Sequence, residues 1–322
     1  MKNNNIEKYI SFCKTEKYLP IFMQYWWLDS TAWKWNWNVI LIENWWNIKA
    51  IFPYFINRRF KIFKTFSNPK LTQFLWPYIK YPEWQKVTSK LNFEKKILNQ
   101  IISKIPKYDL YDQSFSANIK NYLPFYWKKF EETTRYTYII DKLSSINNIY
   151  ENFEWKIKTD IKKAEKLVKT ISNNDIDSFY KLNKKSFDRQ NIKIPYSINF
   201  IKNIDNECVK NNCRKIFFAV DEKNNLHAAI YIIWDNNSAY YLMWWWNPEF
   251  RNSWATTLLL WEAIKFSSTV TKSFNFEWSM VEPIERFFRA FWWKQTPYFR
   301  ISKINSKLYL TLKYLSKLFK SD

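Results

Sequence analysis

Acidic and phenolic side chains at the ends of two β-rich segments are the first candidates for chemistry. Glu277 ends the segment Ser273–Glu277, and a carboxylate at the lip of a sheet can act as a general base toward an attacking amine. Tyr240 and Tyr241 alternate faces of a second segment, so one should face a cleft, and Tyr241 is the candidate general acid. A salt bridge to Lys or Arg is the alternative role for Glu277, and the sequence leaves both open.

The sequence contains no glycine and twenty tryptophans. An average chain of this length would carry roughly 23 glycines, and glycine is the default residue where φ is positive. The tryptophans cluster beside Asn and Pro, where turns belong. We therefore hypothesise that UGA codons meaning glycine have been translated as tryptophan. The positions assigned to glycine are Trp33, Trp35, Trp45, Trp46, Trp76, Trp84, Trp155, Trp244, Trp245, Trp246, Trp254, Trp278, Trp292 and Trp293.

Six tryptophans lie in apolar runs and are interpreted as ordinary tryptophan: Trp26, Trp27, Trp37, Trp127, Trp234 and Trp261. A natural protein that is rich in tryptophan and free of glycine remains the alternative.

The loop 244–254 would become glycine-rich under this hypothesis, and it directly precedes a predicted helix over 255–267. Backbone N–H groups at a helix N-terminus, together with the positive end of the helix dipole, favour anions. Arg251 adds a charged donor, although a plain connecting loop is the alternative. Arg189 and Gln190, in a polar segment between two predicted helices, are candidates for holding an anionic acceptor, with a solvated loop as the alternative.

The composition excludes several classes of site. The net charge is +22, which suits either a lysine-covered surface or an anionic partner such as a phosphorylated cofactor, RNA or acidic lipid. The single histidine, His227, is expected to pack in the core, and with it alone no Ser-His-Asp or Cys-His set can be argued. Three cysteines give neither a disulfide framework nor a metal spacing. The sequence also shows no signal peptide and no apolar run of membrane-spanning length, so we expect a cytoplasmic location.

Hydrophobic periodicity predicts a mixed α/β (α+β) fold. In the first part we expect a hairpin of strands 37–43 and 48–56, a helix at 93–105, and strands at 108–115 and 135–140. In the second part we expect helices at 157–167, 176–187, 197–211, 255–267 and 283–290, and strands at 215–220, 227–234, 239–243, 273–277 and 298–303. Asp175 or Asn174 and Ser197 are candidate helix caps.

The segments 157–166, 186–197, 227–266 and 274–303 together resemble the GNAT acyltransferase superfamily. More narrowly, they resemble the FemAB-like and CelD/BioF-like acetyltransferase-domain proteins. The resemblance implies two GNAT-like lobes, each with a mixed, mostly antiparallel sheet flanked by helices. The expected domains are an N-terminal lobe at 1–145, a catalytic lobe at 146–303 and a basic amphipathic tail helix at 304–322.

The resemblance also implies a site for a cofactor pyrophosphate, held by backbone N–H groups after the fourth strand. The family pattern Gln/Arg-x-x-Gly-x-Gly/Ala corresponds here to Arg251-x-x-Trp254-x-Thr256, so Thr256 departs from it. The sheet is expected to splay at 243/244, where N–H groups would polarise a thioester carbonyl. The cofactor-binding candidates are Met243, Trp244, Trp245, Arg251, Asn252, Ser253, Trp254 and Ala255.

The implied activity is transfer of an acyl group from acetyl-CoA or another acyl-CoA to an amine, without a metal ion. A small molecule or a cell-envelope or polysaccharide precursor of a bacterial cell would be the acceptor, and DNA is not expected as a partner. One alternative is a Fem-type aminoacyltransferase that uses aminoacyl-tRNA on a peptidoglycan precursor. Another is a non-catalytic basic RNA-binding module. The tail 304–322 would either contact an anionic membrane or pack on the domain.

Overall fold

The computed structural model of the chain describes residues 2–318 except 34–35, 45–46, 190–192, 278 and 292–293, and the side chains of residues 2, 3, 189 and 316–318 fall outside that description. The chain forms two compact units. Unit 1 contains Met1–Lys17, Phe22–Arg135 and Pro297–Asp322, and unit 2 contains Tyr18–Ile21 and Tyr136–Thr296. The C-terminal segment of the chain therefore belongs to the same unit as the N-terminal segment.

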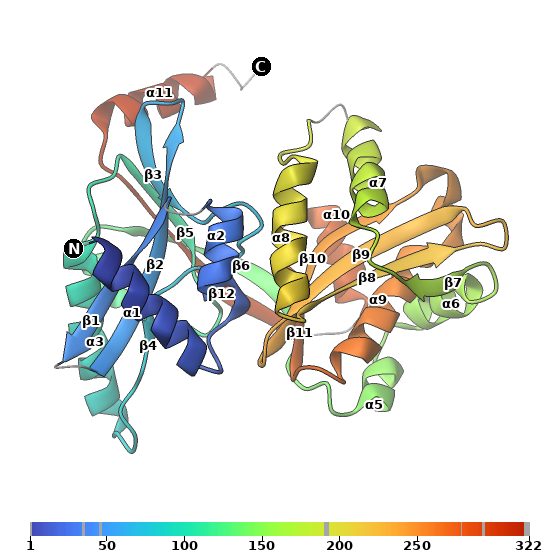
Figure 1. Cartoon of the computed structure of the whole chain (residues 1–322), viewed down its shortest axis with the longest axis horizontal. Helices are drawn as coiled ribbons and strands as arrows, with labels where there is room; N and C mark the ends of the chain where they lie inside the picture. Colours follow the sequence, from blue (N-terminus) through green and yellow to red (C-terminus); the bar gives the residue numbers. More distant parts are fainter. Residues whose placement is uncertain are drawn as a thin grey trace. The chain divides into compact units, whose positions relative to one another are not determined.

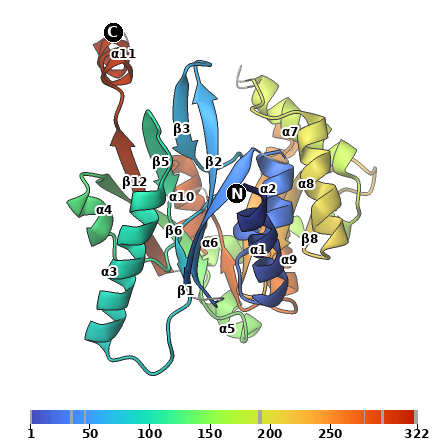
Figure 2. The ribbon, with the colours of Figure 1, turned by 60° about the vertical axis from the view of Figure 1, so that its left-hand side comes forward.

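Unit 1 is a small sheet with helices on both sides. Helices α1 and α3 lie on opposite sides of the strands β1 and β2 (Figure 2). The strand order is β1-β2-β3-β5-β12, with β4 beside β2. The elements are α1 (Lys2–Thr15), α2 (Tyr25–Thr31), β1 (Trp37–Asn44), β2 (Asn47–Arg59), β3 (Phe63–Ser67), β4 (Tyr78–Ile79), α3 (Val87–Lys104), β5 (Leu110–Ser114), α4 (Leu123–Trp127), β12 (Lys294–Ile304, which begins in unit 2) and α11 (Lys307–Leu318).

Unit 2 is a second sheet between two pairs of helices. Helices α7 and α8 cover one face, and α6 and α9 cover the other (Figure 1). The strand order is β6-β11-β10-β9-β8-β7. The elements are β6 (Glu131–Ile140, which begins in unit 1), α5 (Ile146–Glu151), α6 (Trp155–Ala164), β7 (Lys169–Ser172), α7 (Ile176–Arg189), α8 (Ile198–Lys210), β8 (Arg214–Val220), β9 (Leu226–Trp234), β10 (Ser238–Trp246), the 3₁₀ helix η2 (Pro248–Ser253), α9 (Ala255–Ser267), β11 (Ser273–Asn275) and α10 (Glu282–Arg289). A further 3₁₀ turn, η1 (Ile21–Met23), lies where the units meet in sequence.

Both sheets are mixed but mostly antiparallel. The β3/β5 pair and the β10/β11 pair are parallel, whereas β1/β2, β2/β3, β7/β8, β8/β9 and β9/β10 are antiparallel. Parallel neighbours need a crossover connection, and α9 supplies it between β10 and β11. The predicted fold class, α/β (α+β) with mostly antiparallel sheets flanked by helices, is confirmed.

The core of unit 2 lies between the sheet and helix α9. Ten of the thirteen α9 residues read ATTLLLWEAI, and Leu258, Leu259 and Leu260 are all nearly inaccessible to solvent. Burial of each such side chain stabilises the fold by about 1.5–3 kcal/mol relative to exposure. Because this helix is anchored so firmly, its N-terminus is a fixed point on which a site can be built.

The prediction that Trp244–Trp246 form a turn is wrong. These three residues continue β10 and pair with Ile230, Ala229 and Ala228 of β9. The apolar strand β9 is long enough to supply partners beyond residue 243, so pairing overrides the turn signal of the adjacent Asn247 and Pro248. The corresponding expectations for Trp45–Trp46 and Trp292–Trp293 fall on residues outside the described part of the chain.

Candidate functional site

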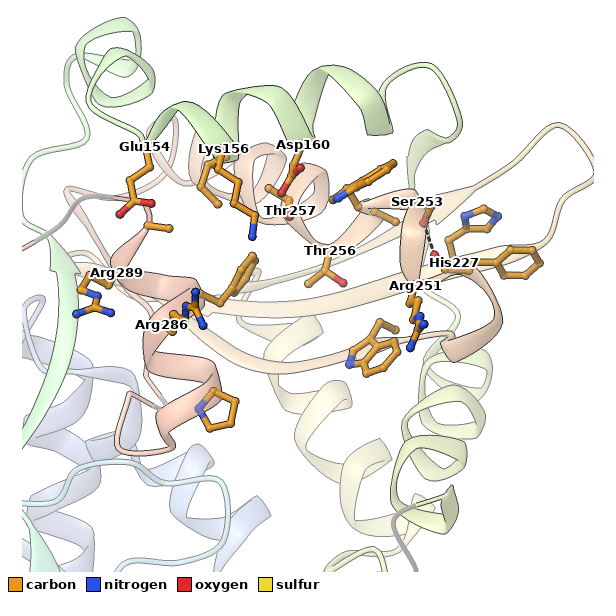
Figure 3. Close-up of a pocket in the computed structure, with 18 residues that line it drawn as sticks. Glu154, Lys156, Asp160, His227, Arg251, Ser253, Thr256, Thr257, Arg286 and Arg289 are labelled. Atoms are coloured by element: carbon orange, nitrogen blue, oxygen red, sulfur yellow. Dashed lines mark hydrogen bonds between the residues drawn. The ribbon is translucent and has the colours of Figure 1, made fainter.

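A cavity of about 610 Å³ opens in unit 2 beside the N-terminus of α9. The first half of α6, the η2–α9 junction and α10 form its walls (Figure 3). The aromatic rings of Trp246, Phe250, Trp254 and Phe287 line it together with polar and charged side chains. The volume is within the range of small-molecule sites.

Four cations surround this cavity. Lys156 comes from α6, Arg251 from η2, and Arg286 and Arg289 from α10. The four side chains come from three different elements (Figure 3). The acids Glu154 and Asp160 also line the wall, and burial raises the pKa of Asp160 while Lys156 and Lys163 lower it. The balance of charge in the opening therefore favours an anionic ligand.

The N-terminus of α9 faces the same cavity. Ala255, Thr256 and Thr257 form the first turn and all line it. The N–H of Thr257 donates to the backbone oxygen of Trp254 over 3.0 Å, which, among the described residues, leaves those of Ala255 and Thr256 as the donors without an acceptor in the preceding turn. The positive end of the helix dipole adds to their attraction for anions. The cavity therefore combines backbone donors with arginine and lysine side chains, which is the donor set that binds phosphate groups.

Trp254 occupies the N-cap position of α9 in an unusual conformation. Its φ is 53° and its ψ is 18°, in the left-handed region, and it makes no side-chain capping hydrogen bond. The ammonium of Lys163 lies 4.7 Å from the centre of its ring. A left-handed conformation costs a residue with a Cβ roughly 1–2 kcal/mol, whereas glycine adopts it readily.

His227 lies at the end of the cavity that Arg251 occupies (Figure 3). Its ring stacks on Phe250 with ring centroids 4.0 Å apart and an interplanar angle of 5°. Its Nε2 lies 3.4 Å from a carboxylate oxygen of Asp221. Hydrogen bonds, chiefly from Asn225, lower the pKa of Asp221 to about 2, so this carboxylate is ionised at neutral pH. The side chain of His227 is buried, as expected from the sequence, but it also lines the cationic cavity.

A second, smaller cavity of about 150 Å³ lies between α7 and β10. Its walls are mainly apolar, and Trp246 lines both cavities. Asn183 of α7 donates to the backbone oxygen of Trp244 over 3.2 Å and accepts from the hydroxyl of Tyr196 over 2.8 Å. Strand β10 therefore carries the cationic cavity at its end and an apolar cavity along its length.

A β-bulge interrupts β10 at Leu242, in the wall of the smaller cavity. Tyr241 pairs with Ile232 and Met243 pairs with Tyr231, so β10 has one residue more than its partner at Leu242. A bulge leaves the extra residue out of the regular ladder and bends the strand. One consequence is visible in the aromatic contacts, because Tyr241 and Trp244 stack with their rings 5.4 Å apart although they are three residues apart.

Residues 152–269 match a family model described as an acetyltransferase (GNAT) domain. This span includes α6, η2 and the N-terminus of α9, which are three of the elements around the cationic cavity. The chain carries a GNAT acetyltransferase domain. The expectation of an acyltransferase enzyme is confirmed at this level, and no curated protein matches the chain.

Solved structures share the architecture of the GNAT domain and of unit 1. The crystal structure of FemX has a TM-score of 0.65 at 11% identity, covering 91% of this chain and 95% of that one. The C-terminal domain of a putative lysylphosphatidylglycerol synthetase from Agrobacterium fabrum has a TM-score of 0.57 at 9% identity and covers 99% and 97%. L-PGS from Bacillus licheniformis has a TM-score of 0.50 at 8% identity and covers 88% and 89%. At these identities the likeness concerns the fold.

Glu277 of unit 2 is buried and lies outside the strand that was predicted to contain it. Strand β11 ends at Asn275, and Glu277 follows it with a φ of 58° and an exposed fraction of 3%. Its N–H donates to the side chain of Asn275 over 2.9 Å. Its Oε1 has no hydrogen-bond partner among the described residues, and burial raises the pKa of the carboxyl well above its ordinary value. Glu277 does not line either cavity described above.

The other predicted residues fall into three groups. Arg251, Ser253, Trp254 and Ala255 line the cationic cavity, while Asn252 is exposed beside it. Met243, Trp244 and Trp245 line the smaller cavity instead. Tyr241 is buried against Trp244 and Phe288, and burial raises the pKa of its hydroxyl. Arg189 ends α7 but its side chain is not described, and Gln190 lies outside the described residues.

Several residues were not assigned to the site from the sequence, and Arg286 was interpreted as the structural partner of Glu282. The residues not assigned are Lys156, Asp160, Arg286, Arg289, Asn183 and Tyr196. The spacing of Arg286 and Arg289 at i and i+3 on a predicted helix puts them on one face, and this signal could have found them. Lys156 and Asp160 are likewise one turn apart on α6.

Among the described residues, no group of three or more His, Cys, Asp or Glu side chains could hold a metal ion. Likewise, none of the described helices has the length and apolar character needed to span a bilayer.

Proposed function

We propose that this chain is an N-acyltransferase that transfers an acyl group from acyl-CoA to an amine. The observation that carries this proposal is the cavity at the N-terminus of α9, where Lys156, Arg251, Arg286 and Arg289 surround helix N–H groups. The CoA pyrophosphate is an anion of matching chemistry. The GNAT domain match over residues 152–269 supports the same donor class.

The charge of the cavity fits CoA, and one side chain restricts the space. Trp254 lines the cavity at the N-cap, where a phosphate must approach the backbone closely. A glycine there would remove both the indole and the Cβ. The proposed donor site therefore has the cations and backbone donors that a pyrophosphate needs, while the indole of Trp254 narrows the space available to it.

We propose that β10 brings donor and acceptor together. An acyl chain extending from the cationic cavity would pass Trp246 toward residues 243–245. Among the described residues, the pairing of β10 with β11 ends at Tyr240, so the edge of β10 beyond it could present backbone groups that polarise a thioester carbonyl. The amine would enter through the apolar cavity beside Asn183 and attack the carbonyl directly, releasing the thiol. Arg189 and Gln190, at the end of α7, remain candidates for binding the acceptor.

Glu277 and Tyr241 are proposed to serve this reaction through proton transfer. Because the pKa of Glu277 is raised, its carboxyl would accept a proton from the amine only after it has ionised. Since neither side chain lines a described cavity, a water molecule would have to relay the proton. The phenol of Tyr241, whose pKa is raised, would stay protonated and could donate to the leaving thiolate.

Calorimetric titration with acetyl-CoA tests the donor site. We expect Arg251→Ala and Arg286→Ala each to weaken binding by about tenfold to a hundredfold, because a hydrogen bond to a charged group is worth about 1.5–3 kcal/mol. Lys223→Ala, which removes an exposed cation away from the cavity, is the matched control and should leave binding unchanged. Equal affinity in all three variants would contradict the assignment of the cavity.

A Fem-type aminoacyltransferase is the second candidate function. Two observations favour it: the FemX fold extends over both units of the chain, and Thr256 stands where the CoA-binding pattern has a small residue. An aminoacyl-tRNA donor predicts binding of charged tRNA that weakens steeply with salt, together with no binding of acetyl-CoA. Tight binding of tRNA without transfer to any amine or peptidoglycan precursor would instead favour a non-catalytic RNA-binding module.

A further inference from the structure

Large apolar side chains are exposed at one end of unit 1. Phe60 and Ile62, at the tip of the β2–β3 hairpin, are 69% and 60% exposed. Leu308, Leu312 and Leu315 of α11 are 60%, 41% and 44% exposed. Folding gains nothing from apolar side chains left in water, so a group of this size indicates a contact outside the chain.

The hairpin tip holds these side chains outward despite backbone strain. Phe60 and Lys61 have φ values of 52° and 63°, as the two central residues of a type I′ turn require. Such turns favour Asn-Gly, because residues with larger side chains are strained in this region. Within the described part of unit 1, the exposed ring of Phe60 contacts the guanidinium of Arg59, which lies 5.6 Å from the ring centroid.

Helix α11 is fixed to the hairpin through its first turn. Tyr309 is buried with its ring 5.1 Å from that of Phe63, and the guanidinium of Arg59 lies 5.6 Å from the Tyr309 ring. Leu308, Leu312 and Leu315 are spaced at i, i+4 and i+7 and therefore form one stripe along the helix. The anchored face and the leucine stripe are different faces of the same helix.

The charge around these apolar side chains is basic. Arg58, Arg59, Lys61 and Lys64 surround the hairpin tip, and Lys307 and Lys313 lie on either side of the leucine stripe. The segments 57–67 and 304–318 contain no acidic residue. Asp109 is the nearby acid, and it accepts a hydrogen bond from the backbone N–H of Lys64.

We propose that this surface, consisting of the hairpin tip 58–64 and helix residues 307–315, docks on an anionic lipid bilayer. Leucine, isoleucine and phenylalanine side chains would enter the boundary of the acyl chains, and the arginine and lysine side chains would contact anionic headgroups. Of the exposed apolar side chains of this surface, Phe60 and Tyr314 carry rings on which a base could stack, whereas the leucines and Ile62 offer a nucleic acid none and suit acyl chains. Two copies of the same basic surface would repel each other. The proposal concerns unit 1 and does not depend on the transferase activity.

Co-sedimentation of the full chain with vesicles tests the proposal. We expect binding to vesicles of phosphatidylcholine with phosphatidylglycerol, weaker binding at high salt, and little binding to phosphatidylcholine alone. Two double variants, Phe60→Ser with Ile62→Ser and Leu308→Ser with Leu312→Ser, should each reduce vesicle binding by about tenfold or more. Each removes several methylene equivalents that would be buried in the bilayer on binding. Arg58→Gln with Lys61→Gln should weaken binding to the anionic vesicles and leave apolar surface in place.

The matched control is Val87→Ser with Leu91→Ser on α3, which removes two side chains that are 75% and 48% exposed in the same unit. It should bind vesicles like the unmodified chain. Unchanged binding in both apolar variants, or equal binding to the two kinds of vesicle, would overturn the proposal. So would loss of single-stranded RNA binding in these variants without any vesicle binding, or a concentration-dependent dimer that they abolish. Thermal unfolding of each variant establishes that the fold is retained.

Discussion

The carboxyl group of Glu277 is buried, so its ionisation costs free energy. Its pKa is raised by burial, so the folded chain binds this proton more tightly than the unfolded chain does. The associated stability is fully present below the ordinary pKa of a glutamate and is lost as pH rises through the raised folded-state pKa. We expect thermal stability to fall from mildly acidic to mildly basic pH, and Glu277→Gln to reduce this fall.

Melting temperatures across that pH range measure the effect. Glu249→Gln replaces an exposed acid of η2 and should leave the pH dependence as it is. If Glu277 is also the base of the reaction, the transfer rate rises over the same range and Glu277→Gln removes the rise. A stability profile identical in the two proteins would contradict the buried, protonated carboxyl.

The tryptophans divide into two kinds by their surroundings. The indole N–H groups of Trp27 and Trp37 donate to Thr72 and Asp29 over 3.0 and 2.9 Å. Trp245 is fully buried, yet its indole nitrogen has no partner within the described part of the chain. Trp84 is 98% exposed with a φ of 57°. These contrasts support, as a proposal, the interpretation that some of these positions are glycine in the native protein.

Replacement of Trp254 with glycine tests this interpretation at the position where the site is affected most. Removing the left-handed strain should raise the free energy of unfolding by about 1–2 kcal/mol, and opening the space at the α9 N-cap should strengthen acetyl-CoA binding. Urea denaturation and calorimetry measure the two effects. Trp127→Gly, at an exposed tryptophan interpreted as genuine, should give neither gain.

The mass of the natural protein decides the codon hypothesis directly. A peptide that spans residue 254 and carries a glycine mass there supports it. An indole mass at residue 254, or a loss of stability in Trp254→Gly, would contradict it.

At the scale of elements, a buried ionic contact holds α8 to the sheet. Arg214 of β8 and Asp205 of α8 are both 6% exposed in their side chains and lie 2.9 Å apart. The hydroxyl of Tyr231 on β9 also donates to Asp205 over 2.9 Å. Asp205→Ala would leave the guanidinium buried without its carboxylate, and we expect a loss of about 3–5 kcal/mol in unfolding free energy.

Chemical denaturation measures this loss. Asp177→Ala is the control, because Asp177 pairs with Lys202 at an exposed position over 2.8 Å. An exposed pair contributes about 0–1 kcal/mol. Similar losses in the two variants would show that the Asp205 contact has no special role.

The elements that local chemistry specifies were predicted well. The hairpin of β1 and β2, helix α9 and the cap at Ser197 follow from alternation, periodicity and capping, and the Ser197 hydroxyl accepts from the N–H of Phe200 as expected. Helix α1 was not predicted, because its asparagines and lysines give a weak apolar pattern. Tyr9, Phe12 and Cys13 form its buried side, and that burial depends on tertiary partners.

At the scale of the molecule, the site joins segments that are distant in sequence. Lys156 and Arg286 meet Arg251 because α6 and α10 both approach the N-terminus of α9. The sequence identified the α9 end of the cavity from local signals, and it could not bring the α10 arginines to that end without the fold. Part of the net charge of +22 is concentrated at two surfaces, because cations gather around the cavity in unit 2 and around the hairpin tip in unit 1.

The extra residue at Leu242 sets which way the end of β10 faces. Deleting it would restore regular alternation and turn residues 243–246 over as a block, so that side chains now facing α7 would exchange places with those facing the α9 side. The separation of a cationic compartment from an apolar one therefore depends on the number of residues in β10. The strand must contain one residue more than its partner β9, whatever the chemical identity of the neighbouring side chains.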